Sequence, residues 1–502
     1  MKQDFFSTYK ALRNRMRKFR PRSILRMSMN CLSQAANSKL EELQKHPWHL
    51  LLLVKWALQD PMASDRDGRE ISPAEFDDLR QRLFDFPERI SLSPEEGSAM
   101  LFVRLILRQQ VAFQRRPSPA FLREAALIGE LASEHRLRLL FREKTGLDAL
   151  QFMDLAFAAY VAVLDKGQRT LNTDWFRPLR TAYGDQCVDA FIRNVSRSYE
   201  ELVVFCRNLP DANKRRASEF YEFTPLRRFP FLRTGDVLEY WHPMVFFRGM
   251  EGFVHSVLSE AGQDYIDRFS KIFENHVVGE VRNKGWSFFD EAQLQTLIGS
   301  EQRVPDALIS FPDVNLFIEV KAGLFDESVM VAGHPEILVH KTRALRTGIA
   351  QGWSASVGLR IARKAPAQVL RASKDYLLVV TNKELNASRG MTLREMYPAG
   401  KLDYTSPEAE PYLPLERVYV LSIDDFERLM AAARRPGFDV PQFLDKCMES
   451  DTDPSALKYF FWQHLDALRV PNGWSPLLSE ALDHAQERLG NALQGSIPSV
   501  TG

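Results

Sequence analysis

Two carboxylates and one amine occur at short spacing in the segment from Val304 to Lys321, and together they could support phosphodiester hydrolysis. Asp306 precedes one short apolar run, while Glu319 and Lys321 lie at the end of a second. Neighbouring carboxylates repel each other, and a divalent cation relieves that repulsion. A bound cation can lower the pKa of a water molecule and offset charge on a leaving oxygen. We expect Lys321 to hold or polarise that water, or to contact a phosphate.

A β-hairpin is the element that must position these side chains. The apolar runs 307–311 and 316–320 flank a Pro-Asp pair that is typical of a tight turn. Because side chains alternate along a strand, Glu319 and Lys321 are expected on the same face. Antiparallel pairing of the two runs would bring Asp306 towards Glu319 at one end of the hairpin. The alternative is an ordinary exposed hairpin, since Glu-x-Lys triplets are common and Pro-Asp pairs are more often turns.

The separation of Asp306 from Glu319 and Lys321 resembles the motif of the PD-(D/E)xK, or restriction-endonuclease-like, nuclease superfamily. In that family the Asp and the Glu hold the metal, and the Lys assists the attacking water. The resemblance implies that Asp306, Glu319 and the main-chain carbonyl of Val320 bind Mg²⁺ or Mn²⁺. It also implies in-line attack on a phosphodiester that leaves a 5′-phosphate. The resemblance covers roughly residues 269–434, about a third of the chain.

A helix upstream of the hairpin carries a further acidic candidate. Apolar residues recur at helical spacing over residues 269–281. The family carries a glutamate on the helix before its core sheet, and Glu274 matches it, with Glu280 as the competing match. Glu274 would bind the metal through water or orient Lys321. The alternative is a solvated helix glutamate.

A helix downstream of the hairpin carries an amide candidate. Residues 341–354 are expected to form a helix that ends near Gly352. Many members of the family have a glutamine on the helix after the Glu-x-Lys strand, and Gln351 matches it as a supporting catalytic residue. A glutamine near a helix end is usually a surface residue, so this match is informative only together with the others.

The length indicates more than one domain, and the composition is that of a soluble globular protein. The chain has 502 residues, of which 45% are hydrophobic and 26% are charged, and a single core rarely serves so long a chain. The formal net charge of +1 gives no global field for nucleic acid. Any attraction to DNA must therefore be local.

The cysteines and the hydropathy pattern indicate a cytoplasmic protein. Its four cysteines lie far apart without a Cys-x-x-Cys pair, which argues against a zinc site and a disulfide framework and favours a reducing compartment. No uninterrupted apolar run is long enough for a transmembrane helix. The charged N-terminus lacks the apolar core of a secretory signal. We expect no association with a membrane.

Three regions follow from the distribution of helical and strand-like patterns. Residues 1–210 are expected to form an α-helical domain. Residues 217–435 are expected to form the nuclease domain, with apolar strands at 376–381 and 418–423 that are covered on both faces. Residues 436–502 return to helical patterns as a C-terminal cap. The predicted fold class is multidomain: an α-helical N-terminal domain, a mixed α/β restriction-endonuclease-like core and a short α-helical C-terminal region.

The N-terminal segment is strongly basic, with nine basic residues among the first 30 against one acid, Asp4. It could be an arm that grips a phosphate backbone, because Lys and Arg release counterions on binding. It could also be an Arg-rich transit peptide. A third interpretation is a solvated helix face or a protein-docking arm.

The leading hypothesis is a metal-dependent nuclease that hydrolyses DNA, with Mg²⁺ or Mn²⁺ as its cofactor. An α-helical front end on such a nuclease looks like bacterial anti-phage defence effectors or mobile-element nucleases, whose helical domain could bind a protein partner or sensor. A second hypothesis is a non-catalytic nuclease-fold scaffold for a protein or nucleic acid, although three uncompensated charges together argue against it. A third is a ribonuclease with the same site, because groove shape and 2′-hydroxyl contacts separate RNA from DNA.

Overall fold

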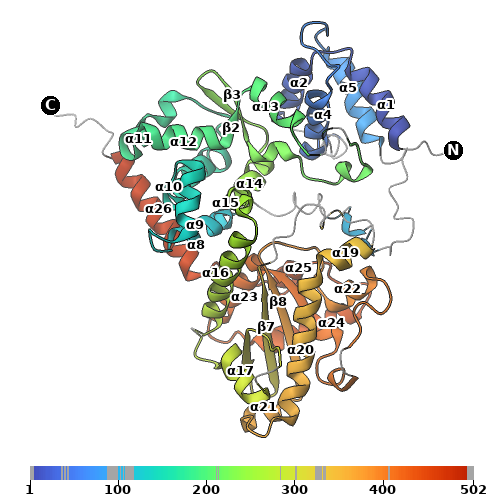
Figure 1. The fold of residues 1–502 in the computed structure, drawn as a ribbon, viewed down its shortest axis with the longest axis vertical. Helices are drawn as coiled ribbons and strands as arrows, with labels where there is room; N and C mark the ends of the chain where they lie inside the picture. The colour runs from blue at the N-terminus through green and yellow to red at the C-terminus, as the bar shows by residue number, and fades with distance from the viewer. Residues whose placement is uncertain are drawn as a thin grey trace. The chain divides into compact units, whose positions relative to one another are not determined.

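The computed structural model shows a mixed α/β protein with two mixed sheets and about 62% helix. The described residues are 5–34, 38, 41, 45–86, 100, 101, 103–105, 107, 118–210, 212, 214–282, 284–299, 302–322, 329, 331, 335–404 and 407–494. The chain divides into two compact units (Figure 1). Unit 1 comprises Met1–Ser93, Gln109–Glu260 and Glu480–Gly502, and unit 2 comprises Pro94–Arg108 and Ala261–Ser479.

Unit 1 is built mainly from helices whose first residues explain where they begin. α4 (Pro47–Gln59) and α5 (Pro73–Phe84) both have proline in the first turn, where a backbone N–H has no helical partner to lose. α10 (Ala149–Tyr160) and α13 (Tyr199–Arg207) begin with capping boxes. These local signals are readable in the sequence, so the helical character of this region was predictable.

Unit 1 also contains a small sheet, which corrects the prediction of a purely α-helical N-terminal domain. Its strand order is β1 (Thr170–Leu171), β4 (Val237–Tyr240), β3 (Phe231–Thr234) and β2 (Ser196–Arg197). β3 pairs antiparallel with β4 and parallel with β2. Strands of two residues are too short to leave a period-two pattern in a sequence.

The division into units differs from the predicted domain boundaries. Residues 217–260, which were expected to begin the second domain, lie in unit 1, where β3 and β4 pair with β2 and β1. Residues 436–479 of the predicted cap lie in unit 2, and residues 480–494 lie in unit 1. There Arg488 donates hydrogen bonds of 2.6 and 2.7 Å to Asp154 on α10. These pairings are distant in sequence, so periodicity could not reveal them.

Lys2 lies outside the described residues, and the other basic residues of this segment, from Lys10 to Arg26, lie on or beside two helices, α1 (Phe5–Met16) and α2 (Pro21–Ser33), and not on an extended arm. Their arginines form ion pairs with acids of unit 1: Arg15 with Asp78, Arg17 with Asp60, Arg20 with Glu70 and Arg22 with Glu200. Much of the positive charge is therefore neutralised in place, which argues against an arm that grips phosphate.

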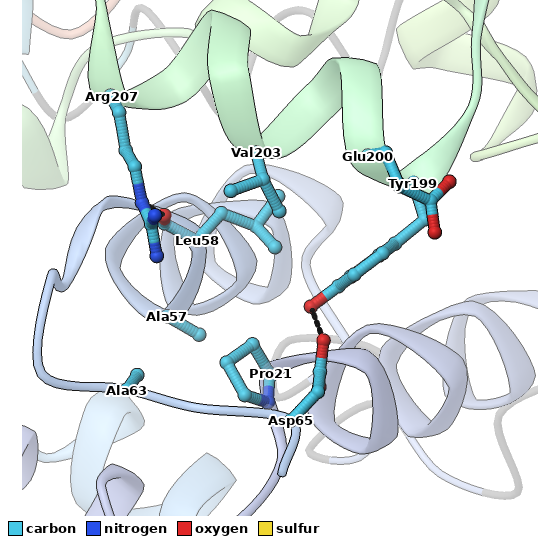
Figure 2. A pocket seen from close by; sticks show the side chains of 9 residues that line it. All are labelled: Pro21, Ala57, Leu58, Ala63, Asp65, Tyr199, Glu200, Val203 and Arg207. Atoms are coloured by element: carbon cyan, nitrogen blue, oxygen red, sulfur yellow. Dashed lines mark hydrogen bonds between the residues drawn. The ribbon is translucent and has the colours of Figure 1, made fainter.

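A hollow of about 230 Å³ lies beside α13 in unit 1 (Figure 2). At its edge the Tyr199 hydroxyl donates a 2.5 Å hydrogen bond to Asp65 Oδ2. The guanidinium of Arg22 lies 4.1 Å from the centre of the Tyr199 ring, and the Arg22 N–H donates to Asp65 Oδ1. The polar groups at this edge are hydrogen-bonded to one another and join α13 to the segment after α4. Their role is therefore explained by structure alone.

Unit 2 is organised around a five-stranded mixed sheet of order β5-β6-β7-β8-β9. β5, β6 and β7 are antiparallel neighbours, whereas β7, β8 and β9 are parallel. The predicted hairpin is confirmed as β6 and β7, and the two predicted apolar strands are confirmed as β8 and β9. The strands are β5 (Ser287–Asp290), β6 (Ala307–Ser310), β7 (Val314–Lys321), β8 (Lys374–Thr381) and β9 (Val418–Ser422).

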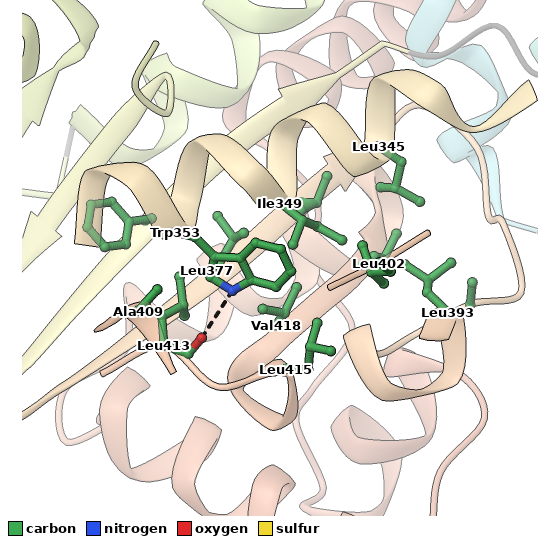
Figure 3. Close-up of a cluster of buried hydrophobic side chains, with 14 of the residues drawn as sticks. Leu345, Ile349, Trp353, Leu377, Leu393, Leu402, Ala409, Leu413, Leu415 and Val418 are labelled. Atoms are coloured by element: carbon green, nitrogen blue, oxygen red, sulfur yellow. Dashed lines mark hydrogen bonds between the residues drawn. The ribbon is translucent and has the colours of Figure 1, made fainter. Parts of the chain in front are cut away.

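Helix α20 (Arg343–Ile361) covers one face of this sheet (Figure 1). Its residues Leu345, Ile349 and Trp353 recur every fourth position and pack with Leu377 and Val418 of the sheet in one buried cluster (Figure 3). The Trp353 indole N–H also donates a 3.1 Å hydrogen bond to the Leu413 carbonyl. α16 (Gln263–Arg282) and α23 (Ile423–Ala433) pack against the sheet outside this cluster.

The prediction that this helix ends near Gly352 is wrong, because α20 continues to Ile361. A β-carbon on Gly352 would lie 2.7 Å from Leu377 Cδ2, and one on Gly358 would lie 2.4 Å from Ile298 Cγ2. Both glycines therefore allow close packing inside the helix. Neither acts as a stop signal.

In the part of the chain that the structure describes, no single helix is both long and apolar enough to cross a membrane. Residues 136–145 and 149–164 reach that length and composition only as a pair, which is bent by 56°. The four cysteines are free thiols.

Candidate active site

Asp306 and Glu319 lie at the same end of the β6–β7 hairpin. The antiparallel register pairs Ala307, the first residue of β6, with Ile318, so Asp306 directly precedes β6 at the end where Glu319 lies on β7. The two carboxyl groups are close enough for the charge of Asp306 to raise the pKa of Glu319. The Val320 N–H donates a 2.6 Å hydrogen bond to Asp306 Oδ2, which fixes this carboxylate beside β7. The two acids that the sequence predicts to converge are therefore brought together.

Both carboxyl groups titrate above their ordinary range because they are shielded from water. Glu319 is 0% exposed, and its pKa is raised to about 8, chiefly by burial and secondly by the nearby charge of Asp306. Burial also raises the pKa of Asp306 to about 6, although the hydrogen bond from Val320 lowers it. An additional positive charge is needed for both groups to be ionised at neutral pH.

Lys321 already offsets part of the effect of burial, because its charge lowers the pKa of both acids. Its Nζ forms an ion pair with Glu319 Oε1, and its side chain is 21% exposed. The pairing follows from strand alternation, which places residues 319 and 321 on one face. The predicted residues Asp306, Glu319 and Lys321 therefore form one cluster, in which the Lys321 side chain is more exposed to solvent than that of Glu319.

The donor set fits a cation that takes only part of its coordination from protein. Among the described residues, no group of three or more His, Cys, Asp or Glu side chains is arranged to hold a metal ion. Although Glu319 is completely buried, its Oε2 accepts no hydrogen bond from a described residue, and its Oε1 is held by the ion pair with Lys321. Mg²⁺ commonly binds through one or two carboxylates and fills its other positions with water and phosphate oxygens. Asp306 and Glu319 could hold such an ion. The Val320 carbonyl stays a predicted ligand.

α20 passes directly over these side chains. A β-carbon on Gly348 would lie 2.7 Å from Glu319 Cγ and 3.2 Å from Lys321 Cε. Contacts below 3.0 Å force something to move, so only glycine fits the helix at this point. The helix thereby limits the space available to Glu319 and Lys321. The sequence analysis did not identify Gly348 as part of the site.

Of the two candidate glutamates on α16, only Glu274 is associated with the acid pair. Its charge contributes to the raised pKa of Asp306, and it forms an ion pair with Lys271. Glu280 instead pairs with Arg434 on the α23 side and is buried there. Glu280 follows Glu274 by six positions, which is more than one and a half helical turns, so the two side chains have different surroundings.

Glu291 is a further acid near the site that the sequence did not single out. It is the first residue of α17 (Glu291–Ile298), and its charge raises the pKa of both Asp306 and Glu319. The signal that could have found it is the Asp290–Gln293 capping box, which begins a helix just before the hairpin.

Gln351 lies near the chain that leads into Asp306 but is not shown to contact the acids. Its Nε2 donates a 3.1 Å hydrogen bond to the Val304 carbonyl, two residues before Asp306. The amide therefore connects α20 to the start of the hairpin. Its predicted part in catalysis stays a prediction.

Neither a scan against protein-family models nor searches of curated proteins and of solved structures finds a match to this chain. The residues and their geometry therefore carry the functional argument by themselves.

Proposed function

We propose that this protein is a metal-dependent nuclease that hydrolyses phosphodiester bonds of DNA. Asp306 and Glu319 would hold Mg²⁺ or Mn²⁺, Lys321 would contact the attacking water or the phosphate, and Glu274 and Gln351 would support the site. The observation that carries the proposal is the close pair of Asp306 and Glu319, shielded from water and accompanied by an amine on the same face as Glu319.

The proposed fold of unit 2 is a restriction-endonuclease-like core. Its support is the order α16, β5, β6, β7, α20, β8 and β9, with an antiparallel half and a parallel half of one sheet. In this arrangement the acid pair lies where β6 begins and β7 ends. An α-helical unit attached to such a core also motivates the proposal of an anti-phage or mobile-element effector, which rests on fold analogy.

The proposed reaction is in-line displacement at phosphorus. A new bond forms between a water oxygen and the phosphorus, the bond to the leaving 3′-oxygen breaks, and the products are a 5′-phosphate and a 3′-hydroxyl. The water loses one proton and the leaving oxygen gains one. A bound cation would lower the pKa of the water and offset negative charge on the phosphate. Lys321 has the exposure to reach a phosphate, whereas Glu319 is buried on β7 and Asp306 is held by its hydrogen bond from Val320.

A digestion panel tests the proposal. Single- and double-stranded DNA and RNA are incubated with the full chain and Mg²⁺ or Mn²⁺, beside Lys321→Ala and Asp306→Asn. The control is Lys446→Ala, which removes an exposed lysine of α24 (Val440–Thr452). Metal-dependent cutting of DNA that persists only in wild type and the control is expected. Cutting of RNA but not DNA would show that RNA is the substrate. If Lys321→Ala cuts as fast as wild type, this site does not carry out the reaction.

The ion pair between Lys321 and Glu319 favours a second candidate, a non-catalytic scaffold with a nuclease fold. In that case the amine is a permanent counterion that makes the buried carboxylate tolerable, and no cation is required. The scaffold would bind a protein or nucleic acid without any cutting. Binding of such a partner that is unaffected by both substitutions, with no digestion by wild type, would support it.

A further inference from the structure

A hollow of about 400 Å³ lies between α20 and the residues that lead into Asp306. On one side it is lined by Gln302 and Arg303, and on the other by α20 from Thr347 to Ile361. This volume is within the roughly 300–1,000 Å³ that small-ligand sites occupy.

The hollow adjoins the candidate active site through two residues that line it. Gln351 donates to the Val304 carbonyl, and Thr347 immediately precedes Gly348, where an added β-carbon would meet Glu319 and Lys321. A ligand in the hollow would therefore lie next to whatever Asp306 and Glu319 hold.

The charge of the hollow is opposite to that of the acid cluster beside it. None of the described residues that line it is acidic. Arg303 is exposed and forms no ion pair with a described residue. A guanidinium that has no acidic partner among the described residues and lies three residues before Asp306 is suited to bidentate contact with a phosphate.

The far end of the hollow is apolar and open to solvent. Ile361 is 73% exposed, which is unusual for a large aliphatic side chain, and Val357 lies one helical turn before it. Gln302 and Ser354 add hydrogen-bonding groups to the same lining. A cation, polar groups and an apolar surface in one hollow match the phosphate, sugar and base of a nucleotide.

We propose that this hollow binds one nucleotide of the substrate strand beside the scissile phosphodiester. Arg303 contacts the phosphate of that nucleotide, and Val357 and Ile361 support the flat face of its base. The inference rests on the proposed nuclease function and extends it to a strand-binding subsite. Because one separate nucleotide is held, the bound strand is single-stranded or locally unpaired at this position.

Binding without metal tests the subsite independently of cutting. A short fluorescein-labelled DNA strand is titrated with the full chain in EDTA, and anisotropy is followed at several salt concentrations. Arg303→Ala is expected to weaken binding about tenfold, the effect of one lost charged hydrogen-bonded contact. It should also reduce the slope of log affinity against log salt by about 0.7, as for one lost phosphate contact on a single strand.

The apolar end is tested with a strand that lacks one base. Ile361→Asp should weaken binding of the intact strand several-fold with little change in salt slope, and a scan of abasic positions should show one position at which this variant no longer differs from wild type. Both substitutions are at exposed positions, so circular dichroism and melting should match wild type. Lys446→Ala is the matched control. An RNA strand and a blunt duplex form the comparison arms.

The outcomes separate this inference from the proposed function. If Arg303→Ala binds every strand with wild-type affinity and salt slope, the subsite is refuted, even where wild type cuts DNA. If Arg303 and Ile361 are required for binding but Mg²⁺ and Mn²⁺ give no cutting, the subsite stands and the nuclease proposal fails. Tighter binding of duplex than of single strand would also contradict the inference.

Discussion

A β-carbon on Gly348 would lie only 2.7 Å from Cγ of Glu319, so the helix and the acid occupy adjoining space with no room for a side chain. Glycine in a helix interior is destabilising by about 1 kcal/mol relative to alanine. The close approach of α20 to Glu319 on β7 explains why glycine is present at this helix position. The position of α20 is therefore linked to that of the acid pair.

Replacing Gly348 by alanine should therefore disturb the acid pair selectively. Gly348→Ala is expected to weaken Mn²⁺ binding at least about tenfold by isothermal titration, because the new methyl group displaces Glu319 or Lys321. Gly279→Ala in α16, where nothing lies within 4 Å, should leave Mn²⁺ affinity unchanged and raise stability by about 0.5–1 kcal/mol. Equal Mn²⁺ affinity in both variants would contradict the positioning of Glu319 by α20.

A rescue substitution distinguishes this contact from a general disturbance of packing. Glu319→Ala removes the Cγ atom that the new methyl group meets, so the double variant Gly348→Ala/Glu319→Ala should be more stable than the sum of the two single effects predicts. Such coupling is expected only for residues in contact. Additive effects on the free energy of unfolding would show that the two positions act separately.

The stability of the metal-free protein should fall as pH rises through the titration of Glu319. Its pKa is about 8 in the folded protein against 4.5 ordinarily, so its contribution is complete below pH 4.5 and is lost as pH rises towards 8. The free energy of unfolding in EDTA should drop by about 5 kcal/mol over that interval. Urea unfolding at several pH values measures it. Glu319→Gln should flatten the profile, and Mn²⁺ should restore stability at pH 8.

Substitutions of the two glutamates of α16 should affect different properties, Glu280 the stability of the protein and Glu274 its affinity for Mn²⁺. Glu280→Ala removes the partner of Arg434 and is expected to lower stability by about 1–2 kcal/mol with unchanged Mn²⁺ affinity. Glu274→Ala removes a surface ion pair with Lys271, so stability should change by less than about 0.5 kcal/mol. Its Mn²⁺ affinity should fall several-fold if Glu274 binds the ion through water. The opposite pattern would make Glu280 the supporting acid.

The far end of α20 should depend on Asp375, a fully buried acid of β8. Its carboxylate accepts hydrogen bonds from Ser356 (2.5 Å) and Arg360 (2.8 Å) of α20 and from Asn315 (3.1 Å) of β7. Asp375→Ala would leave Arg360 without its buried partner and is expected to lower the free energy of unfolding by about 3 kcal/mol. Asp313→Ala, at an exposed turn, is the control for chemical denaturation. Equal stability of the two variants would show that this network does not hold α20.

The hairpin and the convergence of its acids were predictable because both are local. Two apolar runs around a turn define the strands, and an antiparallel register follows from a tight turn, so Asp306 could be placed near Glu319 before any coordinates. The burial of Glu319 could not be predicted, since it depends on Gly348, which is distant in sequence and interpretable only once α20 is in place.

The extent of α20 and the limits of the units were mispredicted for related reasons. Glycine is the residue type that typically ends a helix, but Gly352 lies inside α20. There it leaves space for the side chain of Leu377, which belongs to a strand later in the chain. Residues 217–260 join unit 1 through strand pairing with Thr170–Leu171 and Ser196–Arg197, which no window of neighbouring residues contains. Contacts of long sequence separation decided each case.

The discontinuity of unit 1 has a consequence during synthesis. Arg488 on α26 (Pro476–Gln494) bonds to Asp154, so this unit gains its last helix only after all of unit 2 has been translated. Unit 2 is continuous from Ala261 to Ser479 and needs besides only the earlier segment Pro94–Arg108. On the ribosome the sheet that carries the acid pair can therefore fold first, whereas unit 1 can be completed only when its C-terminal segment from Glu480 has been synthesised.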